Sequence, residues 1–284
     1  MILILECGST KSDWSLLRPQ GGTISFSDSG INPSTLTRAE VDRYIHRGSE
    51  KMEDPSRITK IYHYGAGVSG TQQQELLREI YHLYFSNATL SLEGDMLAAV
   101  RATIGDEKGI VCILGTGSNS CYFDGRTIKA NYQGFGYLIG DEGGGVDMGT
   151  RLIKLYYSNS LPTEIARELE AELGDRSAFV KKLYSHNKPN RYLASFTPIM
   201  ARHQNHPVVK AEIRGSFEAL IKNYLSKYPE IDKLPINFVG SISEHFRDIL
   251  TETLESQGLK AGKFVTRPMI ELEKYHYKEL QNEQ

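Results

Sequence analysis

Two short runs of small residues, one domain-length apart, are the places in this sequence where a phosphate could bind. Gly8-Ser9-Thr10-Lys11 follows the apolar residues 2–5, and Gly115-Thr116-Gly117-Ser118 follows the apolar residues 110–114. Each run leads into a second apolar stretch, which is typical of two buried strands joined by a tight turn. A turn of Gly, Ser and Thr exposes backbone N–H groups and hydroxyls that bind anions. The repeat predicts two halves that hold one phosphate-bearing ligand.

A third small-residue turn, Gly240-Ser241, follows the late apolar run 236–239. The sequence contains no G-x-x-x-x-G-K-[ST] motif and no H-R-D signature of protein kinases. If the chain binds a nucleotide, it does so with a different architecture.

Charged residues lie beside these turns. Glu6 ends the first apolar run, where its carboxylate is either a solvated strand end or, beside phosphates, a partner of Mg²⁺ through water. Lys11 either neutralises phosphate charge as a point cation or lies in solvent.

Asp95 lies between Glu93-Gly94 and the apolar residues 96–100. In one interpretation it is the N-cap of a helix. In the other it is a general base, since a hydroxyl that attacks a γ-phosphate needs a carboxylate to orient it and accept its proton. One carboxylate can serve both roles, because capping uses one oxygen.

The segment Gly134–Gly145 is the richest in glycine and also contains two aromatic residues and the adjacent acids Asp141 and Glu142. It is either a set of turns or a ligand loop, in which the backbone approaches the ligand closely and Asp141 accepts hydrogen bonds from hydroxyls.

The hydrophobic pattern of the sequence predicts the helices and strands that must position these residues. It indicates an α/β chain in which one order of elements occurs twice. After the first hairpin we expect strands at 23–28, 58–64 and 88–92, and helices at 38–52, 72–85 and 96–104. The pattern restarts with strands at 110–114, 118–123 and 126–130, a mostly helical stretch at 146–227, strands at 236–239 and 263–266, and a last helix at 270–280. We expect domains at 1–105 and 106–267, with residues 268–284 joining the first.

Composition narrows the function classes. The 284 residues are 39% hydrophobic and 24% charged with a formal net charge of −2, which argues against nucleic acid or an anionic membrane as the main partner. Cys7, Cys112 and Cys121 are sparse and lack metal-ligand spacing, so we expect a reducing, cytoplasmic location. No signal peptide or membrane span is expected.

Five blocks together resemble the acetate kinase/hexokinase/Hsp70/actin superfamily of ATPases. More closely, the chain resembles the BadF/BadG/BcrA/BcrD-type family, which unites N-acetylglucosamine kinases with ATPase activators of benzoyl-CoA reductase. The blocks are Glu6–Lys11, Gly94–Ala99, Leu114–Asn119, Gly136–Gly143 and Val239–Ser241.

The resemblance implies two ribonuclease-H-like domains with ATP and Mg²⁺ in a cleft between them and extra helices inserted in the second. It places the phosphates at Gly8, Ser9, Thr10 and Lys11 and at Gly115, Thr116, Gly117 and Ser118, and the adenosine near Gly240 and Ser241. It makes Asp95 the catalytic residue, lets Asn32, Asp95, Thr116 and Asp141 contact the sugar, and makes Glu6 the magnesium partner.

The function that follows is an ATP-dependent kinase that phosphorylates a hydroxyl of N-acetylglucosamine or a related N-acetylhexosamine. The expected partner is then a small-molecule sugar. Whether the chain forms a homodimer is left open by the sequence. An ATPase activator is the first alternative, although the three cysteines are poorly placed to share an iron–sulfur cluster. A catalytically silent sugar or nucleotide sensor is the second, because Glu6 stands where the superfamily usually has Asp.

Overall fold

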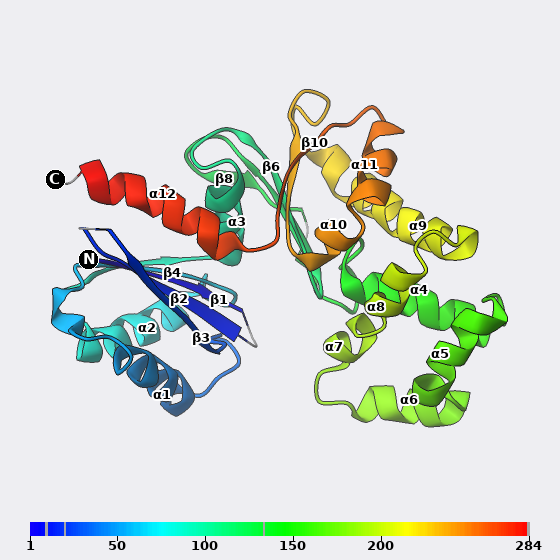
Figure 1. Ribbon diagram of the computed structural model, residues 1–284, viewed down its shortest axis with the longest axis horizontal. Coiled ribbons are helices and arrows are strands. Elements are labelled where there is room, and N and C mark those ends of the chain that lie inside the picture. The colour runs from blue at the N-terminus through cyan, green and yellow to red at the C-terminus, as the bar shows by residue number, and fades with distance from the viewer. Residues whose placement is uncertain (9–10, 20, 133, 283–284) are drawn as a thin grey trace. The chain divides into compact units, whose positions relative to one another are not determined.

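The computed structural model describes residues 1–8, 11–19, 21–132 and 134–282 (Figure 1). Ser9 and Thr10, two of the predicted phosphate-binding residues, lie outside the described residues. The chain forms two compact units, which we call unit 1 (Met1–Asp106 with Arg267–Gln284) and unit 2 (Glu107–Thr266).

Unit 1 is built on a five-stranded mixed sheet with the order β3-β2-β1-β4-β5. Its strands are β1 (Ile2–Cys7), β2 (Lys11–Leu17), β3 (Thr23–Ser29), β4 (Lys60–Gly65) and β5 (Thr89–Glu93). β1, β2 and β3 form an antiparallel meander, whereas β4 and β5 run parallel to β1. Residues 2–5 of β1 are all apolar and fully buried, as expected for a central strand that is covered on both faces.

Helices cover both faces of this sheet (Figure 1). α1 (Arg38–Ser49) and α2 (Thr71–Tyr84) share a core with β1, to which Leu3, Leu5 and Cys7 contribute. On the other face, α12 (Pro268–Asn282) contacts α3 (Asp95–Thr103), β1 and β2. The short helix η1 (Pro55–Arg57) precedes β4. The last helix of the chain therefore packs beside the helix that begins at Asp95.

Unit 2 repeats this sheet, with the order β10-β9-β6-β7-β8. Its strands are β6 (Gly109–Leu114), β7 (Ser118–Phe123), β8 (Ile128–Ala130), β9 (Ile236–Val239) and β10 (Ala261–Val265). β6, β7 and β8 are antiparallel neighbours, and β9 and β10 run parallel to β6. Taken from β8 to β10, the order and directions match those of unit 1.

The extra length of unit 2 is helical. Between β8 and β9 lie α4 (Gly145–Tyr157), α5 (Thr163–Leu173), α6 (Arg176–Ser185), α7 (Pro189–Ala194), α8 (Thr197–Arg202), α9 (Pro207–Asn223) and η2 (Leu225–Lys227). Between β9 and β10 lie α10 (Ser241–His245) and α11 (Arg247–Glu255). Their apolar faces share one core with the sheet, which includes Met148, Phe217 and Leu250. Within the described part of the chain, no helix is both long enough and apolar enough to cross a membrane.

The predicted α/β class with a repeated strand pattern is confirmed. The sequence interpretation missed α10 and α11, because it treated the segment between the last two strands as a connection. A helical signal is present there: Ile242, Phe246, Ile249 and Leu250 recur at helical spacing, and all are buried. β10 also begins earlier than expected, at Ala261, with an irregular register before Phe264.

Candidate functional site

One edge of the unit 1 sheet gathers the predicted site residues of that unit. β4 and β5 run parallel to β1, and β3 does so as well, because β2 reverses direction between them. The carboxyl ends of all four strands therefore meet at one edge, where α/β sheets usually bind ligands. Gly8, Asn32, the turn 65–70 and Asp95 all follow these strand ends.

Glu6 is paired in register with Asp13 across the β1–β2 hairpin. Lys11 Nζ donates to Asp13 Oδ2 at 2.9 Å, and Ser27 Oγ donates to Asp13 Oδ1 at 2.5 Å. Burial, and after it the negative charges of Asp13 and Asp95, raise the pKa of the Glu6 carboxyl to about 7, although the charge of Lys11 lowers it. A cation beside Glu6 would relieve this concentration of negative charge.

The same residues fit a magnesium ion. No group of three or more His, Cys, Asp and Glu side chains in the described part of the chain could hold a metal by itself. Mg²⁺ does not require such a cage, since it usually keeps several waters and binds one or two carboxylates together with substrate phosphates. The half-buried carboxylate of Glu6, next to a second acid and a phosphate-type turn, meets that description.

Asp95 is the first residue of α3, and its N-cap is Gly94, whose backbone is extended. The capping interpretation of Asp95 is therefore wrong, because the cap position is one residue earlier. Burial raises the pKa of the Asp95 carboxyl, while hydrogen bonds from the N–H groups of Met96 and of Asp95 itself lower it. A carboxylate with a raised pKa at the start of a helix is a suitable proton acceptor.

Asn32 lies in the connection between β3 and α1 and is buried. Its Oδ1 accepts a hydrogen bond from the Ser34 N–H at 3.0 Å, and Ser34 Oγ donates to the Gly67 carbonyl at 3.0 Å. A Cβ on Gly67 would lie 2.2 Å from Asn32 Oδ1, so only glycine allows this approach. The turn after β4 and the loop that contains Asn32 are thereby packed together.

In unit 2, Asp141 holds the turn between β6 and β7. Its Oδ1 accepts a hydrogen bond from the Ser118 N–H at 3.0 Å, and a Cβ on Gly117 would lie 2.6 Å from its Oδ2. Asp141 has a φ of 69° and is buried. Burial raises the pKa of its carboxyl, the Ser118 N–H lowers it, and the charge of Glu142 raises it.

The N-terminus of α4 closes the same turn. The N–H groups of Gly145 and Val146 donate to the carbonyls of Gly115 and Thr116 at 2.8 and 2.9 Å. A Cβ on Gly144 would come within 2.7 Å of the backbone of Gly117. The glycine-rich segment of the sequence therefore serves close backbone packing against the turn.

Gly240 lies against the beginning of this turn. Its φ of 118° is in the region that favours glycine, and a Cβ there would lie 2.3 Å from the Leu114 carbonyl and 3.5 Å from the Gly115 nitrogen. The structure thus brings Gly115, Gly117, Asp141 and Gly240 together at the carboxyl ends of β6 and β9. Thr116 and Ser241 are exposed beside them.

A cavity of about 460 Å³ borders α10, whose first residue is Ser241. Its lining is mostly polar and consists of Gln204, Asn205, Lys210, Glu244, His245, Arg247, Asp248, Ile249 and Glu252. None of these residues stood out in the sequence, because two stretches far apart in the chain, 204–210 and 244–252, supply them.

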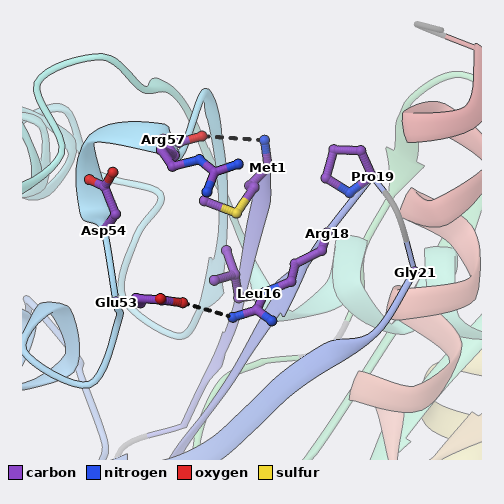
Figure 2. A pocket seen from close by; sticks show the side chains of 8 residues that line it. All are labelled: Met1, Leu16, Arg18, Pro19, Gly21, Glu53, Asp54 and Arg57. Carbon is purple, nitrogen blue, oxygen red and sulfur yellow. Dashed lines mark hydrogen bonds and ion pairs between the residues drawn. The ribbon is translucent and has the colours of Figure 1, made fainter.

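A second cavity, of about 360 Å³, lies in unit 1 where β1 begins and β2 ends (Figure 2). There the Met1 amino group donates to the Arg57 carbonyl at 3.4 Å, and Arg18 Nη2 lies 3.5 Å from Glu53 Oε2. This cavity is at the opposite end of the strands from Glu6 and Asp95, so it is separate from the candidate site.

Asp13 is a site residue that the sequence interpretation missed. Its signal was available: in a hairpin that pairs Cys7 with Ser12, the partner of Glu6 is Asp13. Two acids directly opposite each other destabilise a hairpin, so such a pair in the sequence indicates a functional site.

The repeated sheet and its glycine-lined turns define an actin-like ATPase fold made of two ribonuclease-H-like domains. The chain belongs to the N-acetylglucosamine kinase-like family of this superfamily. A Porphyromonas gingivalis protein provisionally assigned as an N-acetylglucosamine kinase is 36% identical to it, with a TM-score of 0.90 and with 98% of this chain and 99% of that chain covered.

Other comparisons are more limited. The N-acetylmuramic acid/N-acetylglucosamine kinase of Clostridium acetobutylicum is 32% identical over 92 residues, which cover 31% of this chain and only 29% of that protein. A Chromobacterium violaceum protein, also provisionally assigned as an N-acetylglucosamine kinase, is 18% identical with a TM-score of 0.72 over 92% of this chain and 94% of that one. At that identity the likeness shows the fold alone. No family model matches the chain.

Proposed function

We propose that this protein is an ATP- and Mg²⁺-dependent kinase that phosphorylates a hydroxyl of an amino sugar, N-acetylglucosamine or a related N-acetylhexosamine. The P. gingivalis relative, which aligns over nearly the full length of both chains, supports the reaction class. The observation that carries the proposal is Asp95, a carboxylate of raised pKa at the start of α3, near the charge of Glu6.

In this proposal Asp95 orients the acceptor hydroxyl and accepts its proton as the hydroxyl oxygen attacks the γ-phosphorus. Asn32, Thr116 and Asp141 contact the sugar. Asp141 also keeps the 115–118 turn in place through the Ser118 N–H, so its loss would affect both ligands.

The phosphates are bound by the small-residue turns, Gly8–Lys11 and Gly115–Ser118, through backbone N–H groups, hydroxyls and the Lys11 ammonium. Glu6 holds Mg²⁺ through water, and the ion, when bound, neutralises charge on the phosphate oxygens. The adenosine lies near Gly240 and Ser241, where the cavity beside α10 offers amide, carboxylate and imidazole groups for hydrogen bonding.

The test is ADP release measured by a coupled assay with hexoses, hexosamines and N-acetylhexosamines, with and without Mg²⁺. We expect turnover that requires both Mg²⁺ and an N-acetylhexosamine. Asp95→Asn should lower kcat by roughly 10²- to 10⁴-fold, the usual contribution of a general base. Asp106→Asn, which alters an exposed acid beyond the other end of α3, is the matched control and should retain activity.

Other outcomes would contradict the proposal in distinct ways. ATP hydrolysis that does not depend on any sugar would indicate an activator of a partner enzyme. Sugar or nucleotide binding without turnover would indicate a sensor. If Asp95→Asn kept sugar-dependent turnover, the assignment of the base would be wrong although the kinase assignment would stand.

A further inference from the structure

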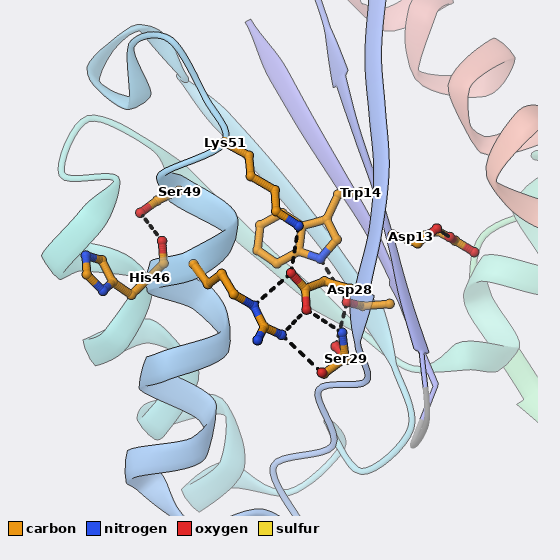
Figure 3. A network of polar contacts seen from close by, with 10 residues as sticks. Asp13, Trp14, Asp28, Ser29, His46, Ser49 and Lys51 are labelled. Carbon is orange, nitrogen blue, oxygen red and sulfur yellow. Dashed lines mark hydrogen bonds and ion pairs between the residues drawn. The ribbon is translucent and has the colours of Figure 1, made fainter.

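The loop that contains Asn32 begins at a dense polar network on α1 and the end of β3 (Figure 3). We propose that Arg47 is a positioning residue for this loop, residues 30–36, and acts on sugar binding by holding Asp28 and Ser29, the two residues directly before the loop. The proposal rests on the proposed function in one respect, namely that Asn32 contacts the sugar. We call residues 30–36 the substrate loop.

Asp28 is the centre of the network. Its side chain is only 7% exposed, and it accepts hydrogen bonds from Arg47 Nε at 2.9 Å, from Arg47 Nη2, and from Lys51 Nζ at 2.8 Å. Burial by itself would raise the pKa of Asp28, but Lys51, Arg47 and the Ser29 N–H outweigh it and hold the pKa at about 2. Asp28 is therefore a permanent anion, and two cations, Arg47 of α1 and Lys51 just after α1, are fixed on it.

Ser29, the last residue of β3, has each of its polar groups bonded. Its N–H donates to Asp28 Oδ1 at 2.6 Å, and its Oγ accepts from Arg47 Nη2 at 3.0 Å. Its carbonyl accepts from Ser12 Oγ at 2.8 Å, and Ser12 Oγ in turn accepts from Trp14 Nε1 at 2.8 Å. The chain direction at the start of the substrate loop is thus set by α1 and β2 together.

Close packing lets α1 reach this point. A Cβ on Gly48 would lie 2.4 Å from the Trp14 ring, so α1 rests directly on β2 beside Arg47. Within the described part of the chain, Arg47 alone among the cations of α1 bonds to both Asp28 and Ser29. Its guanidinium can do so because its planar fork presents several N–H groups in fixed directions.

Other contacts hold the substrate loop itself and do not involve Arg47. The Ile31 N–H bonds to the Cys7 sulfur, and Ser34 Oγ bonds to the Gly67 carbonyl. After the loop, Thr37 and Glu40 form a capping box on α1. Loss of Arg47 would therefore let the loop shift without releasing it, which is the change expected to weaken binding through Asn32 rather than unfold the unit.

The experiment compares Arg47→Met with Arg43→Met. Both arginines leave the same helix and both lie 5.2 Å over the Tyr44 ring, but only Arg47 reaches Asp28. We expect Arg47→Met to raise KM for the N-acetylhexosamine by about 5- to 20-fold while KM for ATP changes by less than about twofold. Arg43→Met should change neither constant, and Arg47→Lys, which keeps the charge but not the fork, should fall between them.

A merely structural Arg47 would lower the melting temperature and leave the ratio of the two KM values unchanged, and that result would overturn the proposal. Amide hydrogen exchange separates this failure from failure of the proposed function, because it needs no activity. Exchange of residues 30–36 should be faster in Arg47→Met than in Arg43→Met, with residues 60–84 unchanged. Equal exchange in the two variants would also overturn the proposal, whether or not the protein turns over sugar.

Discussion

Glu6 and Asp13 lie directly opposite each other on β1 and β2, although both are acids. A pair of like charges in this position normally destabilises a sheet. Lys11 and Ser27 both hydrogen-bond to Asp13, whereas the charge of Lys11 only partly offsets the effects that raise the pKa of Glu6. Burial first, and then the charges of Asp13 and Asp95, raise the pKa of the Glu6 carboxyl to about 7.

Removing the Glu6 charge should therefore stabilise the metal-free protein. Between pH 4.5 and 7 the folded chain keeps a proton on Glu6 that the unfolded chain has lost, so Glu6 makes the free energy of unfolding fall as pH rises through this window. Glu6→Gln should abolish this fall, which amounts to about 1–3 kcal/mol. Urea unfolding across the window measures the effect.

The exposed Glu75 of α2 supplies the control for this measurement. Glu75→Gln should follow the wild-type pH curve. The electrostatic interpretation of Glu6 fails if Glu6→Gln follows that curve too.

Gly117→Ala should be much less stable than Gly115→Ala, although the two glycines share one turn. A Cβ on Gly117 would lie 2.6 Å from Asp141 Oδ2, whereas one on Gly115 meets nothing within 4 Å. We expect Gly117→Ala to lower the free energy of unfolding by about 1–3 kcal/mol, because Asp141 must move away from the Ser118 N–H. Thermal unfolding of the ligand-free variants gives the comparison, and equal melting temperatures would show that Asp141 does not hold the turn.

Gly240→Ala should be poorly tolerated, with Gly258→Ala as its matched control. Both glycines have positive φ, so alanine is strained at each, but a Cβ on Gly258 meets nothing within 4 Å. A Cβ on Gly240 would lie 2.3 Å from the Leu114 carbonyl, so the backbone at Gly240 or Leu114 would have to move. We expect an additional loss of about 2–3 kcal/mol at Gly240, measured by urea unfolding. Similar losses of stability in both variants would mean that the positive φ alone, and not the contact with Leu114, explains why glycine is required at position 240.

His63 should make the protein sensitive to acid. Its Nδ1 lies 2.8 Å from the Tyr81 hydroxyl, and its Nε2 is buried without a hydrogen-bond partner among the described residues. Burial lowers the pKa of the ring to about 4. As pH falls from 6.5 to 4, the unfolded chain takes up the proton first, so the folded state loses stability.

His63→Gln should reduce this loss by about 1–3 kcal/mol, as measured by chemical unfolding at both ends of the window. Burial also lowers the pKa of His276 to about 4, so His276 should account for the loss of stability that remains in His63→Gln. The exposed His46 provides the control, since His46→Gln should leave the loss unchanged. A loss as large in His63→Gln as in the wild type would contradict the assignment.

The sequence alone predicted the elements well wherever periodicity was strong. The apolar runs 2–5 and 110–114 are central strands because only a strand covered on both faces is apolar at successive positions, and small residues after each run marked the turns. The short helices after Ser241 were missed, because a single turn or two of helix gives a weak periodic signal between two strands.

For the site, the sequence determined which residue types were available, and tertiary structure decided what they contact. Asp95 was recognised from its place before an apolar helix, but the assignment of Gly94 as the cap needed backbone angles. That Asp13 opposes Glu6 depends on strand register, which hydrogen bonding between strands sets. Three contacts depend on packing between segments far apart in the chain: Asp141 against Gly117, Gly240 against Leu114, and Arg47 with Asp28. Local sequence carries propensity and pattern, whereas such contacts exist only when the whole core has brought the segments together.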